Sequence, residues 1–169
     1  KTGEGEYKLL TNLQEIPELG GDTEAIEIIN YVDAELPKFR ALTVNGRMFH
    51  NAGSSIVQEL GFTLAAANDL MANLTEKGCK VETVASNMQF TFAIGSNYFM
   101  EMAKIRAARM LWSKIVEQYA PKCSCAYDVY IHATSSTWNK SVYDAYVNML
   151  RTTTETMSAA IAGADSISV

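Results

Sequence analysis

The residues with the clearest chemical potential lie in one turn, Gly46-Arg47-Met48-Phe49-His50, directly after the apolar run at 41–45. A guanidinium such as that of Arg47 can bind a carboxylate or a phosphate, and an imidazole such as that of His50 can act as a general base. The other histidine, His132, falls inside a later apolar run. No acidic residue close in sequence would orient either ring, so a structural role is favoured over a catalytic one for both histidines.

The common phosphate and metal motifs do not occur in the sequence. The turn at 46–53 is neither a Walker loop nor a G-x-G-x-x-G fingerprint, and Gly95 fits an ordinary tight turn better than an anion site. Cys123 and Cys125 are too close for a C-x-x-C zinc pair, and no His/Cys/Asp cluster accompanies them. We therefore expect no metal site, and three reduced thiols in a cytoplasmic protein.

Composition restricts the partners. The 169 residues carry a formal charge of −5, without a basic block, which argues against nucleic-acid binding. The basic stretch at 104–109 is expected to form a solvated or salt-bridged helical face. Every apolar patch is interrupted by charge, so neither a signal peptide nor a membrane span is predicted. The chain starts at Lys1 and ends on an apolar alternating stretch, which suggests a piece of a longer protein.

Alternating periodicities predict strands and helices in turn. Residues 1–21 are expected to be a lead-in, and residues 22–169 one unit. A helix capped by Asp22 or Thr23 should end at Pro37, and a capping box at Ser55 should start a long helix that Gly78 closes. The remaining predicted elements are strands at 41–45, 88–94, 127–133 and 165–169, and helices from 97 to 119 and from the polar loop at 134–144 to Gly163.

The apolar periodicity also predicts which helical faces pack inward. The expected inward residues are, by helix, Ile56, Leu60, Leu64 and Met71; Met100, Ala103, Ala107, Leu111 and Ile115; and Val147, Leu150, Met157 and Ile161.

A strand–helix repeat of about forty residues indicates an α/β fold with parallel βα units. Two architectures remain open, a doubly wound sheet and about half of a TIM-type (β/α)8 barrel, which needs about 250 residues in full. In both, chemistry belongs at the C-terminal strand ends, here 45–50, 95–97 and 132–138. We expect an open sheet with helices on one face, and self-association of the isolated segment through 88–94 or 165–169.

From about Ile26 onward the sequence resembles the coenzyme-B12 acyl-CoA mutases, specifically the methylmalonyl-CoA mutase family. The resemblance is carried by three stretches: residues 35–65 (ELPKFRALTVNGRMFHNAGSSIVQELGFTLA), residues 90–117 (FTFAIGSNYFMEMAKIRAARMLWSKIVE), and residues 131–169, including Asp144, Tyr146, Asn148 and the Arg-Thr-Thr at 151–153. It implies consecutive βα units of a barrel that encloses an acyl-CoA.

The resemblance also shows where this chain departs from catalytic members. Their first turn reads Gly-Tyr-His-Met, and its histidine hydrogen-bonds the thioester carbonyl; here Arg47 and Met48 stand at the second and third positions. Their Arg-Leu-Ser, which contacts the CoA portion, becomes Asn87-Met88-Gln89. Their His-x-Gln-Thr becomes His132-Ala133-Thr134-Ser135, so Thr134 replaces the glutamine near the corrin. These positions match the family site, but we expect them to be degenerate.

By resemblance, the segment looks like the barrel of the non-catalytic small subunit of a heterodimeric mutase that interconverts succinyl-CoA and methylmalonyl-CoA. Adenosylcobalamin would then belong to the large subunit, the expected partner. No catalytic, cofactor or metal residue is expected here, since the family's cobalt-ligating Asp-x-His-x-x-Gly loop is absent. The alternatives are an active mutase barrel with a divergent pocket, in which Arg47 binds an acidic acyl group or a phosphate, and an unrelated α/β binding domain.

Overall fold

The computed structural model describes residues 21–36 and 39–169, and it is organised around one parallel sheet. The strands are β1 (Leu42–Asn45), β2 (Met88–Ile94), β3 (Tyr130–Ser135) and β4 (Ser166–Ser168), adjacent in chain order. All three pairings are parallel, and the register places Val44 beside Phe90 and Phe90 beside Ile131. The predicted α/β fold with parallel strands is confirmed, and the strand order is consistent with part of a barrel.

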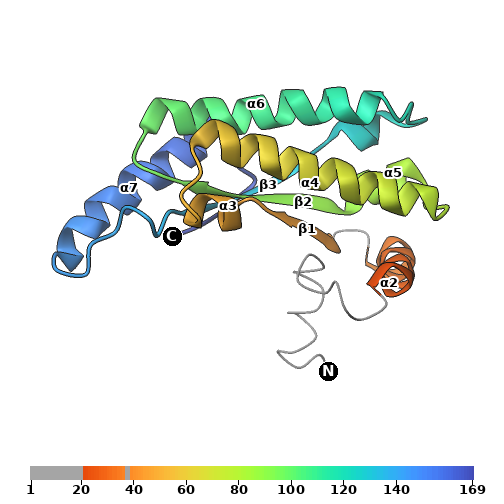
Figure 1. Ribbon diagram of the computed structural model, residues 1–169, viewed down its shortest axis with the longest axis horizontal. Coiled ribbons are helices and arrows are strands. Elements are labelled where there is room, and N and C mark those ends of the chain that lie inside the picture. The colour runs from red at the N-terminus through yellow and green to blue at the C-terminus, as the bar shows by residue number, and fades with distance from the viewer. Residues whose placement is uncertain (1–20, 37–38) are drawn as a thin grey trace.

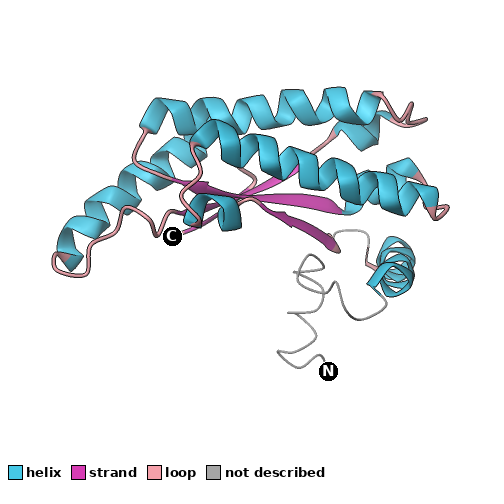
Figure 2. Ribbon diagram, viewed as in Figure 1, coloured by secondary structure: helices cyan, strands magenta, loops and turns pink. Residues whose placement is uncertain are grey.

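Helices α4 (Ile56–Glu76), α6 (Tyr98–Glu117) and α7 (Ala145–Ala162) connect successive strands. Figures 1 and 2 show α4 and α6 lying side by side over one face of the sheet, and α7 packs next to α6. The shorter α5 (Val81–Asn87) precedes β2, and α2 (Gly21–Glu35) lies near the end of the sheet where β1 begins (Figure 1). Helices that follow parallel strands bury the outward sheet face, which is the construction of a βα barrel.

Local capping explains where two of the long helices start and stop. Ser55 and Gln58 form the predicted capping box of α4 through reciprocal bonds of 3.3 and 2.9 Å. The carboxylate of Asp144 accepts from the Val147 amide, and Gly163 ends α7 in the left-handed conformation at φ 85°. The predicted cap of the first helix is wrong because α2 already begins at Gly21. Residues 1–20 of the predicted lead-in and Pro37 lie outside the described residues.

The predicted inward face of α6 is wrong at Met100 and Ala103, whereas Leu111 and Ile115 pack, partly buried, against the core. The buried residues of this helix are Glu101, Lys104, Ile105, Ala108, Trp112 and Val116, whereas Met100 is 45% exposed. Two neighbouring stripes of α6 both repeat with helical period, so periodicity alone could not choose between them. The stripe that packs inward includes two charged residues, which are paired within the protein.

The predicted inward face of α7 is also wrong. Leu150, Met157 and Ile161 are half or more exposed, and the buried residues are Glu155, Ser158, Ala159 and Ala162. The small residues allow close packing on α6, and the Ser158 hydroxyl donates to the Tyr98 carbonyl at 2.8 Å. The prediction for α4 holds better, since Leu64 and Met71 are buried and Ile56 and Leu60 are partly so.

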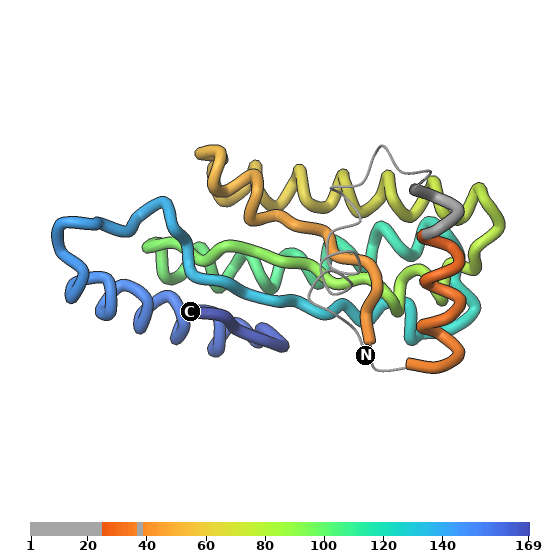
Figure 3. The backbone as a smooth tube through the Cα atoms, turned by 90° about the horizontal axis from the view of Figure 1, so that it is seen from below, coloured from red at the N-terminus to blue at the C-terminus, as the bar shows by residue number. Residues whose placement is uncertain are grey.

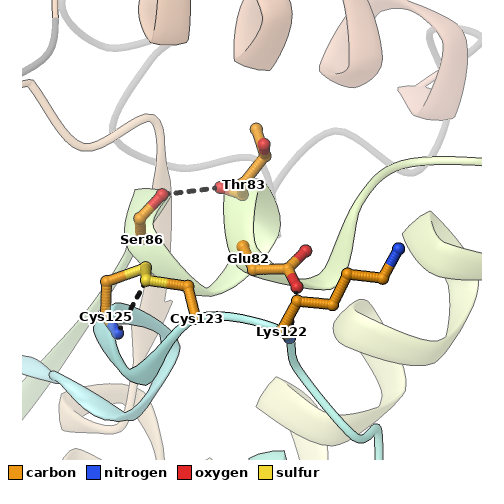
Figure 4. Close-up of a disulfide and its surroundings, with 6 residues drawn as sticks. All are labelled: Glu82, Thr83, Ser86, Lys122, Cys123 and Cys125. Carbon is orange, nitrogen blue, oxygen red and sulfur yellow. Dashed lines mark hydrogen bonds between the residues drawn. A yellow bond between two sulfur atoms is a disulfide. The ribbon is translucent and has the colours of Figure 1, made fainter.

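The segment before β3 differs most from the sequence-based prediction. Strand β3 begins at Tyr130 rather than at 127, because residues 124–127 form the short 3-10 helix η2 (Ser124–Tyr127). Cys123 and Cys125 form a disulfide with their Cα atoms 5.2 Å apart, as Figure 4 shows. That separation lies within the normal range for a disulfide. The prediction of three reduced thiols is therefore wrong for this pair, and Cys79 is the free cysteine.

The disulfide segment is tied to α5. The Lys122 amide donates to the Glu82 carboxylate at 2.6 Å (Figure 4), and this hydrogen bond is the main cause that lowers the pKa of Glu82.

The free edges of the sheet are β1 and β4. Strand β2 is paired on both sides, so residues 88–94 offer no free strand edge, and burial of these residues against a neighbouring molecule stays a prediction. Self-association through residues 165–169 stays a prediction. In the described part of the chain, no helix combines the length and apolarity that a membrane crossing requires.

Candidate functional site: a polar sheet face and the strand ends

The two faces of the sheet have opposite chemistry. Leu42, Val44, Phe90, Phe92 and Ile131 belong to the apolar core. Because side chains alternate along a strand, the intervening residues lie on the other face. That face carries a groove of about 420 Å³, and Figure 3 shows the sheet from this side. The described residues that line the groove are Thr43, Asn45, Arg47, Gln89, Thr91, Tyr130, His132 and Ser166.

Sheet register arranges the groove residues in rows. Asn45, Thr91, His132 and Ser166 are successive partners across all four strands. A second row contains Thr43, Gln89 and Tyr130. Such a surface can hydrogen-bond an extended polar ligand, since almost every position offers a hydroxyl, an amide or an imidazole.

The turn after β1 is fixed against β2. The Gly46 amide donates to the Thr91 carbonyl at 2.8 Å, and a Cβ at Gly46 would collide with the Thr63 hydroxyl. The turn forms a five-residue helix, α3 (Arg47–Asn51), where a simple turn was predicted. Its geometry places Arg47 on the groove, whereas Met48 is 50% exposed and does not line the groove.

His50 lies at the other end of α3 and connects two strand ends. Its Nε2 is 2.6 Å from the Ser136 hydroxyl, and its Nδ1 is 3.5 Å from a carboxylate oxygen of Glu59. Ser136 Oγ also accepts a hydrogen bond from the Trp138 amide at 3.1 Å. Because the Glu59 carboxylate faces Nδ1, the geometry favours a proton on Nδ1, with Nε2 accepting from the Ser136 hydroxyl.

Below His50 is a buried charge cluster formed by Glu59, Glu101 and Lys104. The Lys104 ammonium is 2.6 Å from a carboxylate oxygen of each glutamate and donates to the Ala93 carbonyl at 2.6 Å. Glu59 also accepts from the Ala93 amide at 2.9 Å, and Glu101 from the Gly95 amide at 3.0 Å. All three side chains are at most 1% exposed, so their charges are compensated by one another and by the end of β2.

The order Ser136, His50, Glu59 is that of a hydrolase triad, but its surroundings exclude that chemistry. Ser136 is only 1% exposed, so its hydroxyl cannot reach a substrate. The arrangement instead ties α3, α4 and the loop after β3 together. The structural role favoured for His50 on sequence grounds is supported by this geometry.

His132 sits in the middle of the groove with both ring nitrogens engaged. Nδ1 is 2.7 Å from the Ser166 hydroxyl, and Nε2 is 3.1 Å from the Ser168 hydroxyl. Partial burial lowers the pKa of His132 because desolvation disfavours the imidazolium. The ring is therefore neutral at pH 7 and contributes hydrogen-bonding capacity rather than charge to the groove.

The remaining degenerate positions do not converge. Asn87 is buried at the end of α5 and donates to the Thr83 carbonyl at 2.9 Å. Gln89 donates to the Thr43 hydroxyl at 2.7 Å inside the groove. Thr134 is 8% exposed and lies two residues after His132, on the same face of the sheet. The structure thus brings Arg47, Gln89 and His132 to one groove and leaves Met48 and Asn87 outside its lining.

Sequence reasoning missed the charge cluster. The sequence predicts Lys104 on a solvated or salt-bridged basic face; the ion pairs are there, but the residue is 2% exposed. The acid beside His50 was also missed, since Glu59 lies nine positions away and one helix turn into α4. One signal was available in the sequence. Glu101 and Lys104 are spaced i, i+3 as an ion pair would be, and they lie on the same helical stripe as the apolar residues Ile105, Ala108 and Trp112.

Parallel βα units with a polar groove on the open sheet face define this chain as an α/β protein, consistent with part of a barrel. A family model described as methylmalonyl-CoA mutase matches residues 21–169. The chain is 55% identical over 136 residues to the methylmalonyl-CoA mutase small subunit of Porphyromonas gingivalis (80% of this chain, 22% of that protein). The chain belongs to the methylmalonyl-CoA mutase family, as its resemblance predicted.

Two further relatives are less similar. The methylmalonyl-CoA mutase of Cereibacter sphaeroides is 39% identical over 141 residues, covering 83% of this chain and 20% of the relative. The methylmalonyl-CoA mutase large subunit of Propionibacterium freudenreichii subsp. shermanii is 37% identical over 133 residues, covering 79% of this chain and 18% of the relative. The chain spans about a fifth of the length of these relatives.

The family is one of cobalamin-dependent mutases, but the described residues do not fit the cofactor's cobalt. His50 is enclosed between Ser136 and Glu59, and His132 has both nitrogens at serine hydroxyls. Within residues 21–36 and 39–169, no group of three or more His, Cys, Asp or Glu side chains could hold a metal ion.

Proposed function

We propose that this chain is the barrel segment of the non-catalytic small subunit of a heterodimeric methylmalonyl-CoA mutase. In this proposal it supports a large subunit that holds adenosylcobalamin and interconverts succinyl-CoA and methylmalonyl-CoA. Residues 22–169 would form about half of a barrel that further βα units complete. The observation that carries the proposal is Met48, a thioether at the position where catalytic members have a histidine.

The chemistry of Met48 supports this assignment. A thioether has no proton to donate, so it cannot hydrogen-bond a thioester carbonyl as an imidazole can. The nearby His50 cannot take over that role, because its ring is held by Ser136 and Glu59. Asn87 and Gln89 use amide protons on Thr83 and Thr43, where catalytic members contact CoA.

The similarity to relatives supports the same subunit. The identity is 55% to a small subunit and 37% to a large subunit over similar shares of this chain. The departures from catalytic members lie at the starts or ends of strands, whereas the apolar face of the sheet is covered by helices and buried. This distribution is expected of a subunit that keeps the barrel and lacks the site.

One observation favours the alternative of an active barrel with a divergent pocket. Arg47 lines the groove and could bind an acidic acyl group there. That arrangement provides an anion contact but no donor in place of the missing histidine or glutamine. We therefore retain it as the second candidate.

Copurification tests the proposed function. The intact protein, tagged and produced together with a large subunit of the family, should copurify with it, and the cobalamin absorbance should follow the large subunit when the two are separated. A small-subunit preparation that binds cobalamin and turns over methylmalonyl-CoA alone would contradict the proposal and favour the alternative.

A further inference from the structure

The Cys123–Cys125 disulfide closes a very small ring at the surface of the protein. One residue, Ser124, separates the two cysteines, and both of them are exposed. A disulfide stabilises a fold mainly by restricting the unfolded chain, and this effect becomes smaller as the enclosed loop becomes shorter. A bridge across one residue therefore adds little stability, and its exposed position leaves it open to thiols in solution.

The segment around the disulfide is held in place by contacts that involve no sulfur. Ala126, inside η2, is fully buried, and the Lys122 amide donates to the Glu82 carboxylate of α5. The Asp128 amide donates to the Cys125 carbonyl at 3.3 Å. Figure 4 shows the disulfide next to α5, on which η2 packs. Because these contacts lie on both sides of the bridge, we expect the segment to keep its position when the bridge opens.

The two sulfur atoms differ in their hydrogen bonding. Sγ of Cys123 accepts from the Cys125 amide at 3.1 Å, whereas none of the described residues donates to Sγ of Cys125. A hydrogen bond to the sulfur stabilises the thiolate that forms when a disulfide opens. Cys123 is therefore the better leaving group, because the more stable thiolate leaves faster, and attack at Cys125 is the favoured route.

We propose that Cys123 and Cys125 form a thiol–disulfide exchange site that reacts with a low-molecular-weight thiol. The thiolate of that thiol attacks Sγ of Cys125 and forms a mixed disulfide there, while the bond to Cys123 breaks and Cys123 leaves as the thiolate. A second thiol then attacks the sulfur of the first, which releases Cys125 as a thiolate. In sum, two thiols are oxidised to one disulfide, and the protein disulfide is reduced to two cysteines that take up the two protons.

This exchange site goes beyond the proposed function, since its chemistry needs neither an acyl-CoA nor cobalamin. It also does not depend on whether the subunit is catalytic, so the two proposals can fail separately.

Redox titration of the intact protein in mixtures of reduced and oxidised glutathione tests the exchange. After trapping with iodoacetamide, mass spectrometry should show full and reversible conversion between disulfide and dithiol as the ratio changes. At early times, glutathione should be found on Cys125 and the label on Cys123. Three results would overturn the proposal: a disulfide that persists in excess reduced glutathione, a pair that never oxidises, or glutathione found on Cys123 at least as often as on Cys125.

Matched single variants separate the two sulfurs. Cys125→Ser keeps Cys123 and the backbone amide that donates to it, and Cys123→Ser keeps Cys125 alone. At pH 7 iodoacetamide should label Cys123 roughly threefold or more faster than Cys125, because the Cys123 thiolate is stabilised. Cys79 is the internal control, since burial raises the pKa of its thiol, and it should label slowly and equally in both variants. Equal rates for Cys123 and Cys125 would contradict the assigned roles.

Circular dichroism distinguishes exchange from a structural role. The helical signal of the intact protein should be the same with the disulfide closed and open, because the contacts of Lys122 and Ala126 do not involve sulfur. Loss of helical signal on reduction would make the disulfide structural and overturn the proposal.

Discussion

Lys104 and Glu59 lie 2.6 Å apart with both side chains fully buried, although they come from different helices, α6 and α4. Lys104 also reaches Glu101, so one ammonium compensates two carboxylates at the end of β2. This cluster lies directly beneath the turn that carries Arg47 and Met48, and His50 connects the two. The strand ends are therefore held by buried electrostatics as well as by apolar packing.

Replacing Lys104 by methionine should destabilise the protein strongly. The change leaves two buried carboxylates without their counterion, which costs about 3–5 kcal/mol of unfolding free energy. Lys114→Met on the exposed side of the same helix is the control and should stay within about 0.5 kcal/mol. Urea unfolding followed by circular dichroism measures both. A loss below about 1 kcal/mol for Lys104→Met would contradict the role of the cluster.

Two glycines should respond to alanine in opposite directions. A Cβ at Gly46 would overlap the Thr63 hydroxyl and lie 3.0 Å from the Thr91 carbonyl, so Gly46→Ala should cost about 1–3 kcal/mol. Gly61 lies inside α4, and a Cβ there would meet nothing within 4 Å, so Gly61→Ala should stabilise by about 0.5–1 kcal/mol. Thermal unfolding of both variants provides the comparison. Equal shifts in one direction would show that the turn is not held against β2.

Stability should fall on mild acidification because of His132. Its folded-state pKa is lowered below the ordinary value of 6.5, so the unfolded chain binds more protons as the pH drops through that value. The stabilising contribution is complete above pH 6.5 and is lost as the pH falls toward the folded-state pKa. His132→Asn should flatten the pH dependence of the unfolding free energy between about pH 7 and 5. A wild-type profile that rises on acidification in this range would reverse the assigned sign.

The cysteines should differ in reactivity. Without reductant, iodoacetamide should label Cys79 slowly, because burial raises the pKa of its thiol, and should leave Cys123 and Cys125 unlabelled. Reduction before labelling should make Cys123 and Cys125 available to iodoacetamide. Mass spectrometry of the intact, unfolded protein counts the added groups. Three labels without prior reduction would restore the sequence-based expectation of reduced thiols.

Much of the fold could be predicted because its signals are local. Strand β2 was predicted with its observed bounds, Met88 and Ile94, and the capping box at Ser55 fixed the start of α4. Parallel pairing followed from the strand–helix repeat. The start of β3 could not be predicted, because the short helix η2, which Cys123 caps and which contains Cys125, has no periodicity that the sequence could reveal.

The candidate site was less predictable because it depends on register and on the choice of helical face. Arg47 and His132 are candidates from the sequence alone. Thr91 and Ser166 join them only through sheet register, because both residues are register partners of His132. The burial of Lys104 could not be read from a composition argument about basic residues. It required knowing that Glu59, 45 positions earlier, faces the same strand end.

Steady-state kinetics of the assembled heterodimer test the central claim most directly, with Met48→Ala and Arg47→Ala in this chain at matched concentrations. If this subunit is non-catalytic, turnover should remain within about twofold for both variants, because neither change removes a transition-state interaction. Changing the catalytic histidine of the large subunit should instead lower turnover by about 10² or more. A loss above about tenfold for Met48→Ala, or a sharp rise in the Michaelis constant for Arg47→Ala, with the heterodimer intact, would contradict the account.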